Sequence, residues 1–459
     1  MCEYYFNYHS PQKLRVRSLH SIIPMFSKAL PFLCFFFFVS SSSGVLTIPK
    51  FEEITTEVEL RHRSTYFGDF GLFEKHRRDT DTTTWEHEFR GDLLLKKDRH
   101  LLEFRLGHTI QDENDLLFPP DDTIEQVRQA YLDFNLSDYE ELYVRLGRQE
   151  LSYNQGVLID PNDWYMEGFY FDAVKVYWDG STWDIDVLYA QMADEHDNTL
   201  AGINFERTSE RHTINEFYLW YFGIEEGQDR IPLTGAQGVE AFNLGTRMEG
   251  KLTQDLFYHW MVNYQFGDFH TGGTTSDLDS FNFLVNLDYF VDHKIIRNVG
   301  IEFTVSSGND ADSDEVETFI PAYGNKHNRS GSMDWMSMMN SEILTLYLFA
   351  DLHPKLHGLV EYHHFSMNSL DAGWYLANLG AGWFDDGTLE KWPLPGAEAA
   401  GISKEVGQEV DFHLIVGNNP DRKLSLGYSV FFPGGLLENW DWLNDDTVTW
   451  GYVQTELKF

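Results

Sequence analysis

The sequence predicts an all-β chain that folds as a transmembrane, antiparallel, up-and-down β-barrel of about 18 strands with long extracellular loops. Apolar and polar residues alternate in segments along most of the chain, as in strands with one face toward lipid and one toward water. The longest apolar run, Ala29 to Val39, has 11 residues and is too short for a membrane-spanning helix. Aromatic residues make up 16% of the chain, which suits two girdles at the membrane interfaces. The predicted location is the outer membrane of a Gram-negative-type bacterium.

Residues 1–44 are predicted to be a signal peptide for export. Lys28 precedes the apolar run, and the small residues Ser40 to Gly44 follow it near a cleavage point. Met25 is an alternative start, because it would give a compact basic region before the apolar run. Residues 45–459 are then expected to form a single barrel domain, without a disulfide, since both cysteines lie in the removed segment.

The strands can be placed from the alternation and from the spacing of turns. The last segment ends at Phe459 inside a strand pattern, and a closed barrel gives such a strand a second neighbour by pairing it with the first. Tight turns and long irregular stretches alternate along the chain, which matches short periplasmic turns and longer external loops. The weak segment Leu200–Arg207 has to be counted as a strand, because otherwise the tight turn at Lys251–Asp255 would lie on the external side. The expected strands are Thr56–Tyr66, Thr84–Lys96, Arg99–Ile110, Ile124–Leu136, Glu141–Glu150, Phe171–Trp178, Thr182–Gln191, Leu200–Arg207, Thr213–Phe222, Val239–Glu249, Leu256–Phe266, Ser280–Phe290, Asn298–Ser306, Asn340–Leu352, Lys355–Phe365, Gln408–Val416, Lys423–Phe432 and Val448–Phe459.

Long stretches between strands are candidates for plugs or lids, because a barrel of about 18 strands is wide enough to enclose an aqueous passage. These stretches are Asn154–Tyr170, Gly308–Met339 and Met367–Lys404. The tryptophans in them are candidates for stacking on a sugar, and they are Trp164, Trp335, Trp374, Trp383 and Trp392.

Three groups of local motifs, in order along the chain, resemble the alginate-export family of outer-membrane barrels. They are Leu146–Tyr153 leading to Phe171–Val176, Thr318–Gly324 followed by His327, Gly331 and Asp334, and Gly407–Phe412 followed by Leu426–Ser429 and Phe431–Gly434. The resemblance implies a passive pore with an extended polar lumen, rather than a pump or an enzyme. It also implies a basic lumen that guides a polyanion, and this chain departs from that pattern with 73 Asp+Glu against 34 Lys+Arg.

The polar faces of the strands carry the candidate pore-lining residues. Those of the N-terminal half carry both signs of charge, whereas those of the C-terminal half are mainly acidic, which predicts an arginine-rich mixed wall facing an acidic wall. The candidates are Arg61, Arg63, Arg90, Arg105, Arg145, Arg148, Lys175, Arg247, Glu302, Glu361 and Asp411. For each arginine the alternative is a structural ion pair with a neighbouring Glu. Arg128 and Arg148 fall on the apolar phase of their strands, so that either a β-bulge turns them inward or they extend toward lipid headgroups.

These patterns favour an outer-membrane channel that passively conducts a polar solute, foremost a polysaccharide or oligosaccharide. The alternatives are a general or small-solute porin of cation preference and, third, a barrel enzyme, although no nucleophile motif accompanies pairs such as Glu361 and His363. No catalytic residue, cofactor or metal is expected, with Ca²⁺ bound by acidic loops as a weaker alternative. The expected partners are outer-membrane lipids and lipopolysaccharide, a polar or carbohydrate cargo and a separate periplasmic protein. The acidic balance excludes nucleic acid.

Overall fold

A computed structural model describes residues 51–68, 82–97, 100–113, 123–136, 141–164, 168–193, 198–209, 214–224, 236–271, 273–310, 312–325, 327–372, 401–419, 421–438 and 446–459. The predicted signal peptide, residues 1–44, lies outside these residues, as do Trp374, Trp383 and Trp392. No helix in the described part is long and apolar enough to cross a membrane.

The described chain forms one 18-stranded sheet, in which each strand pairs antiparallel with the next along the sequence. The strands are β1 (Glu53–Gly68), β2 (Thr82–Lys97), β3 (His100–Glu113), β4 (Thr123–Asn135), β5 (Leu142–Gln149), β6 (Phe171–Asp179), β7 (Trp183–Met192), β8 (Thr199–Thr208), β9 (Ile214–Ile224), β10 (Ala236–Lys251), β11 (Leu256–Thr271), β12 (Thr274–Phe290), β13 (Ile296–Ser306), β14 (Ser341–His353), β15 (Leu356–Met367), β16 (Glu405–Asn419), β17 (Arg422–Pro433) and β18 (Val448–Lys458). Two short helices, the 3₁₀ turn η2 (Asn154–Gly156) and α3 (Gly435–Glu438), lie between strands.

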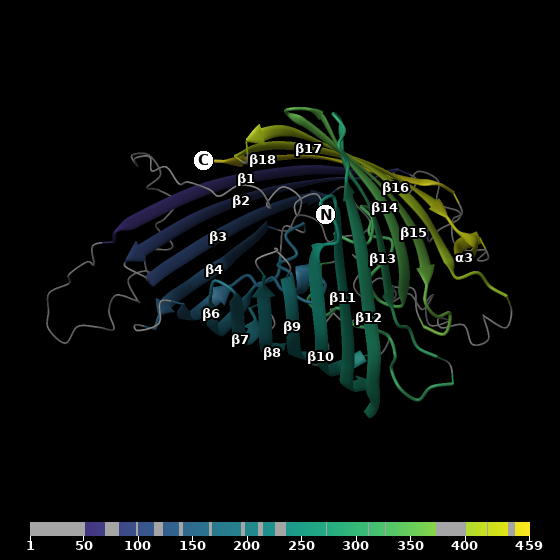
Figure 1. The fold of residues 1–459 in the computed structure, drawn as a ribbon, viewed down its shortest axis with the longest axis horizontal. Coiled ribbons are helices and arrows are strands. Elements are labelled where there is room, and N and C mark those ends of the chain that lie inside the picture. Colours follow the sequence, from purple (N-terminus) through teal and green to yellow (C-terminus); the bar gives the residue numbers. More distant parts are fainter. Residues whose placement is uncertain are drawn as a thin grey trace.

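The sheet closes on itself because β1 also pairs with β18, from Glu59 opposite Lys458 to Gly68 opposite Thr449. Figure 1 shows the purple first strand lying beside the yellow last strand. The predicted barrel is therefore confirmed, and every predicted strand, including the weak one at β8, is present. Several strands are longer than predicted. For example, β12 begins at Thr274 rather than Ser280, because Thr271 already pairs with Thr274 at the end of the β11–β12 hairpin.

The two faces of the wall follow the predicted alternation. In β16, Asp411 and His413 point inward and are buried, whereas Phe412 and Leu414 point outward and are exposed. An exposed apolar exterior is the surface that a lipid bilayer requires, since lipid offers no partners for polar groups.

Two long connections fold into the barrel. Loop 150–170 joins β5 to β6, and loop 307–340 joins β13 to β14. They meet where Ile159 forms a parallel bridge with Tyr323. Tyr323 is fully buried and packs edge-to-face against Phe171 of β6 and Phe222 of β9. Two of the three expected plug segments thus fill part of the interior. Of the third, Met367–Lys404, residues 373–400 lie outside the described part.

Inward-pointing aromatic rings lie over glycines of the neighbouring strand. A Cβ placed on Gly427 of β17 would be 2.1 Å from the ring of Tyr452 of β18, and one on Gly300 of β13 would be 2.1 Å from Tyr347 of β14. Real Cβ atoms do not approach other atoms so closely. Glycine at these positions therefore lets the rings lie flat along the wall.

Gly427→Ala is expected to destabilise the barrel by about 1–3 kcal/mol, the usual effect of forcing a methyl group into a packed site. The matched control is Gly91→Ala in β2, where the nearest side-chain atom to the new Cβ would be 3.8 Å away. Urea unfolding of the refolded proteins in lipid vesicles would measure the difference. Equal free energies of unfolding for the two variants would contradict the expectation.

Candidate functional site

A cavity of about 600 Å³ lies inside the barrel, between its wall and the two inward loops. Its wall side chains come from β1–β3 on one flank and from β15–β18 on the other, and the loops contribute polar groups such as Asp160, Asp163 and Asn325. Most of the lining residues carry charged, amide, hydroxyl or imidazole side chains. The cavity is therefore suited to a hydrated, polar solute rather than an apolar one.

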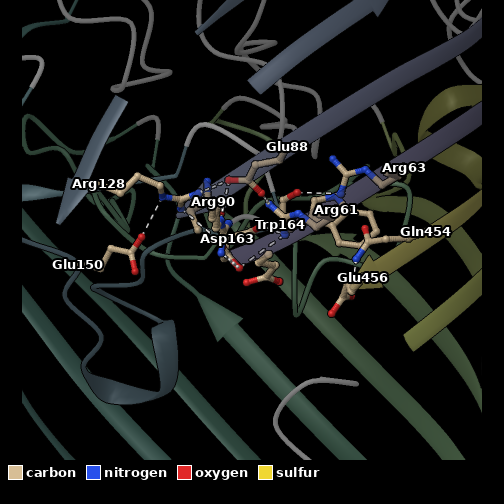
Figure 2. Close-up of polar contacts among 12 residues, drawn as sticks. Arg61, Arg63, Glu88, Arg90, Arg128, Glu150, Asp163, Trp164, Gln454 and Glu456 are labelled. Carbon is tan, nitrogen blue, oxygen red and sulfur yellow. Dashed lines mark hydrogen bonds and ion pairs between the residues drawn. The ribbon is translucent and has the colours of Figure 1, made fainter. Parts of the chain in front are cut away.

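One flank of the cavity is an arginine network, shown in Figure 2. Arg61 of β1, Arg90 of β2 and Arg128 of β4 converge on Glu88, each with a nitrogen 2.6 Å from one of its carboxylate oxygens. The Glu88 side chain is buried, so the three guanidinium groups stabilise a charge that water does not reach.

Asp163 of loop 150–170 binds the same three arginines from the side of the cavity. Arg128 Nη2 lies 3.1 Å from its Oδ1, Arg90 donates to both of its carboxylate oxygens, and Arg61 Nη1 donates to its backbone carbonyl at 2.7 Å. Burial raises the pKa of the Asp163 carboxyl, but the attraction of Arg61, Arg90 and Arg128 outweighs it and holds the pKa well below its ordinary value. Because the pKa is lowered, this attraction stabilises the fold above the ordinary carboxyl pKa and is lost only in strongly acidic solution.

The network continues through Glu150 to Arg105 of β3. Arg128 Nε lies 2.9 Å from Glu150, and Arg105 lies 3.1 Å from Glu150 and 2.7 Å from Asp92. The guanidinium groups of Arg61, Arg90, Arg105 and Arg128 are thus matched by four carboxylates. These contacts are structural ion pairs, which the sequence left open as an alternative role for each arginine. Because the charges are matched, this flank of the cavity is close to neutral.

Alternation alone does not make Arg128 a pore-lining candidate, because it assigns the side chain to the apolar face. A charged residue on that face was the sequence signal for a β-bulge. The β3–β4 pairing shifts between Arg105 opposite Gln129 and Leu106 opposite Val127, so that Arg128 is the extra residue of a bulge. The bulge turns its side chain inward, where it is completely buried. Gly168, at φ +64°, makes room for it, since a Cβ there would lie 2.3 Å from Arg128 Nη2.

Arg148 is placed differently from Arg128. Arg148 lies on the same face of β5 as the exposed Leu146, which is the outer face of the wall. It pairs at 2.9 Å with Asp172, which lies on the same face of β6 as the exposed Val174. Its guanidinium also lies 5.5 Å from the ring centre of Tyr170.

Trp164 closes the arginine flank toward loop 307–340. The Arg63 guanidinium lies 4.2 Å from the centre of its ring, and the His327 ring is stacked on it at 3.9 Å. Both groups occupy space directly against the indole ring. Stacking of a sugar on Trp164 would therefore require one of them to leave. Trp335 is buried against Phe431 and also does not offer a free face to the cavity.

The other flank of the cavity combines carboxylates with histidines. His363 Nε2 lies 3.1 Å from Asp411, and His413 Nε2 lies 3.6 Å from Glu361. The acidic side chains predicted for this wall are thus placed next to imidazoles. Loop 307–340 is held here as well, because the backbone N–H of Met333 donates to Glu409 at 2.9 Å.

Ser332 Oγ lies 3.1 Å from His413 Nε2, and Glu361 is nearby. A serine, a histidine and a carboxylate are thus present, as in a serine hydrolase, but they are not connected in the same way. In such enzymes the carboxylate orients the imidazole from Nδ1, opposite the nucleophile. Here Glu361 approaches Nε2, the nitrogen that already faces Ser332, and Nδ1 faces the hydroxyl of Tyr452 at 3.3 Å. This arrangement does not activate Ser332 in the way a triad would.

The remaining candidates form separate clusters on the inner wall. Arg145 pairs with Asp133 at 2.7 Å, Lys175 with Asp186 at 2.7 Å, Arg247 with Glu206, Glu216 and Glu249 at 2.5–3.1 Å, and Glu302 with Arg329 of loop 307–340 at 2.6 Å. Near Lys175, burial and then the Asp186 carboxylate raise the pKa of the Tyr153 hydroxyl, which donates to that carboxylate at 2.6 Å. These residues are not brought into the central cavity. Among the described residues, no group of three or more His, Cys, Asp or Glu is arranged to hold a metal ion.

Comparisons with known proteins bear on the fold and the family. The barrel is similar to solved structures of Pseudomonas aeruginosa OccK5 (OpdH), with a TM-score of 0.55, 10% identity and coverage of 88% of this chain and 98% of that one, and of P. aeruginosa OpdK with vanillate, with a TM-score of 0.56, 12% identity and coverage of 88% and 98%. Acinetobacter baumannii OccAB1 is also similar, with a TM-score of 0.56, 10% identity and coverage of 89% and 97%. No protein among the curated ones matches this chain. The family model for alginate export matches residues 54–446, most of the sequence, and the chain belongs to the alginate-export family of outer-membrane channels.

Proposed function

We propose that this protein passively conducts a polar carbohydrate, a polysaccharide or oligosaccharide, across the outer membrane. The observation that carries the proposal is the composition of the central cavity. Its arginines are matched by carboxylates, and between them lie amide and hydroxyl groups such as Asn325, Gln454 and Ser425. Paired charges and amides offer hydrogen bonds to sugar hydroxyls without a strong preference for either sign of charge.

A second function, a small-solute porin of cation preference, is supported by a different cavity. This one has a volume of about 570 Å³ and lies at the rim with the long connections, between loop 307–340 and the start of the β15–β16 connection. Five acidic residues, Asp279, Asp310, Glu315, Glu317 and Asp371, line it together with one basic residue, Lys404. Acidic groups gathered at this rim concentrate cations near the barrel. If the cargo is a secreted polymer, we expect a separate periplasmic protein as partner, and for either function lipopolysaccharide would surround the barrel.

Reconstitution in planar lipid bilayers tests the proposal. The expected result is stepwise conductance that neutral oligosaccharides reduce in a concentration-dependent way, because a bound sugar displaces water and ions from the cavity. Conductance that oligosaccharides leave unchanged, together with strong cation selectivity, would favour the small-solute porin. A folded barrel that shows no steps would contradict both functions.

A further inference from the structure

Asp163 differs from Glu88, the other carboxylate that binds Arg61, Arg90 and Arg128, in the part of the chain that supplies it. Glu88 lies on β2, and its side chain is only 1% exposed. Asp163 lies on loop 150–170, and its side chain is 35% exposed at the surface of the central cavity. The loop thus delivers a carboxylate from the interior of the channel to arginines of the wall.

Three guanidinium groups from three strands surround this carboxylate. Arg61, Arg90 and Arg128 reach it from β1, β2 and β4, and Figure 2 shows their side chains converging on Asp163. The planar donor fork of arginine matches the geometry of a carboxylate, and pairs of this kind are among the stronger polar interactions in proteins. A carboxylate carried by a solute in the cavity would make the same contacts if Asp163 were absent.

We propose that Arg61, Arg90 and Arg128 form a carboxylate-binding site that the protein's own Asp163 occupies. By filling this site, Asp163 excludes carboxylated solutes such as uronates and keeps the arginine flank neutral. The inference rests on the proposed channel function. It makes Asp163 the residue that determines whether the channel selects neutral over acidic sugars.

The loop is held independently of the Asp163 side chain, so that the site can be emptied without moving the backbone. Arg61 donates to the Asp163 carbonyl at 2.7 Å, and Arg63 donates to the Trp164 carbonyl at 2.7 Å. On the other side, Asn325 Nδ2 donates to the Asp160 carboxylate at 2.8 Å. None of these contacts uses the Asp163 carboxylate. Removing it leaves Arg61, Arg90, Arg105 and Arg128 facing three carboxylates, with one net positive charge.

Asp163→Ala channels in planar bilayers, exposed to D-glucuronate or D-glucose, test the inference. Glucuronate is expected to reduce the current of the variant at concentrations about tenfold or more below those that affect the unsubstituted channel. The reason is that its carboxylate would bind the three arginines in place of the missing Asp163 carboxylate. Glucose is expected to act equally on both, and the reversal potential in a KCl gradient is expected to shift toward anion selectivity. Asp163→Asn, which keeps the size of the side chain, is expected to show the shift in selectivity with weaker block.

Glu206→Gln is the matched control, because it removes one carboxylate from the lumen wall while Arg247 keeps Glu216 and Glu249. It should not create block by glucuronate. A conducting Asp163→Ala channel with unchanged selectivity and no gain in block would overturn the inference and leave the channel function intact. If neither protein conducts, the channel function fails. Calorimetric titration of glucuronate into the folded proteins then decides the inference, and equal affinity for both would overturn it.

Discussion

Arg128→Ala is expected to lower the free energy of unfolding by about 3–5 kcal/mol, the usual cost of removing one partner from a buried group of charges. The Arg128 side chain is completely buried and lies 2.6–3.1 Å from Glu88, Glu150 and Asp163. Without it, Glu88 keeps only two of its three guanidinium partners. Lysine should not replace it well, because one compact ammonium group cannot reach three carboxylates in different directions as a planar guanidinium does.

Unfolding of Arg128→Ala and Arg128→Lys in urea, followed by tryptophan fluorescence in lipid vesicles, measures this effect. Arg422→Ala, at the exposed start of β17, is the matched control and should change the free energy of unfolding by less than about 0.5 kcal/mol. Stability of Arg128→Ala close to that of the control would mean that water enters the cavity and solvates the carboxylates. The bulge in β4 would then have a role other than burying this charge.

The strands of this protein could be predicted from sequence because the residue types within each strand alternate between those that face lipid and those that face the interior. In β16, Asp411 and His413 alternate with Phe412 and Leu414, and this alternation alone predicts that the apolar pair faces lipid. The bounds were less accurate, because the ends of strands depend on pairing in the hairpin rather than on lipid contact. The closure of β1 on β18 is shown by their antiparallel pairing from Glu59 opposite Lys458 to Gly68 opposite Thr449.

The partners of the charged residues could not be predicted from sequence in the same way. The strand alternation placed Arg61 and Arg90 on the inner face, but Asp163, which binds both, is separated from them by 102 and 73 positions and lies on a loop with no periodic pattern. The bulge at Arg128 reverses a side chain that alternation alone assigns to the lipid face. The sequence predicted that Trp164 could stack on a sugar, but in the fold the Arg63 guanidinium and the His327 ring already pack against its indole ring.

Tyr323→Ala is expected to raise the single-channel conductance several-fold while leaving the barrel intact. Tyr323 is fully buried and anchors loop 307–340 by edge-to-face contacts with Phe171 and Phe222, with ring centres 5.3 and 5.4 Å apart. Truncating a buried aromatic side chain costs about 3–5 kcal/mol. Because Tyr323 lies outside the 18-stranded ladder, most of this cost falls on the docking of the loop rather than on the pairing of strands.

Bilayer recordings measure the conductance, and heat-modifiable migration on a gel reports whether the barrel persists. Tyr289→Ala is the matched control, since this side chain is 49% exposed on the wall and its removal should leave the conductance unchanged. Loop 150–170 is coupled to the same anchor, because the Asp160 N–H donates to the Tyr323 carbonyl at 2.9 Å. A rise in conductance would therefore show that side-chain packing holds both loops in the pore. An unchanged conductance would assign that task to the backbone bridge between Ile159 and residue 323, which the substitution leaves in place.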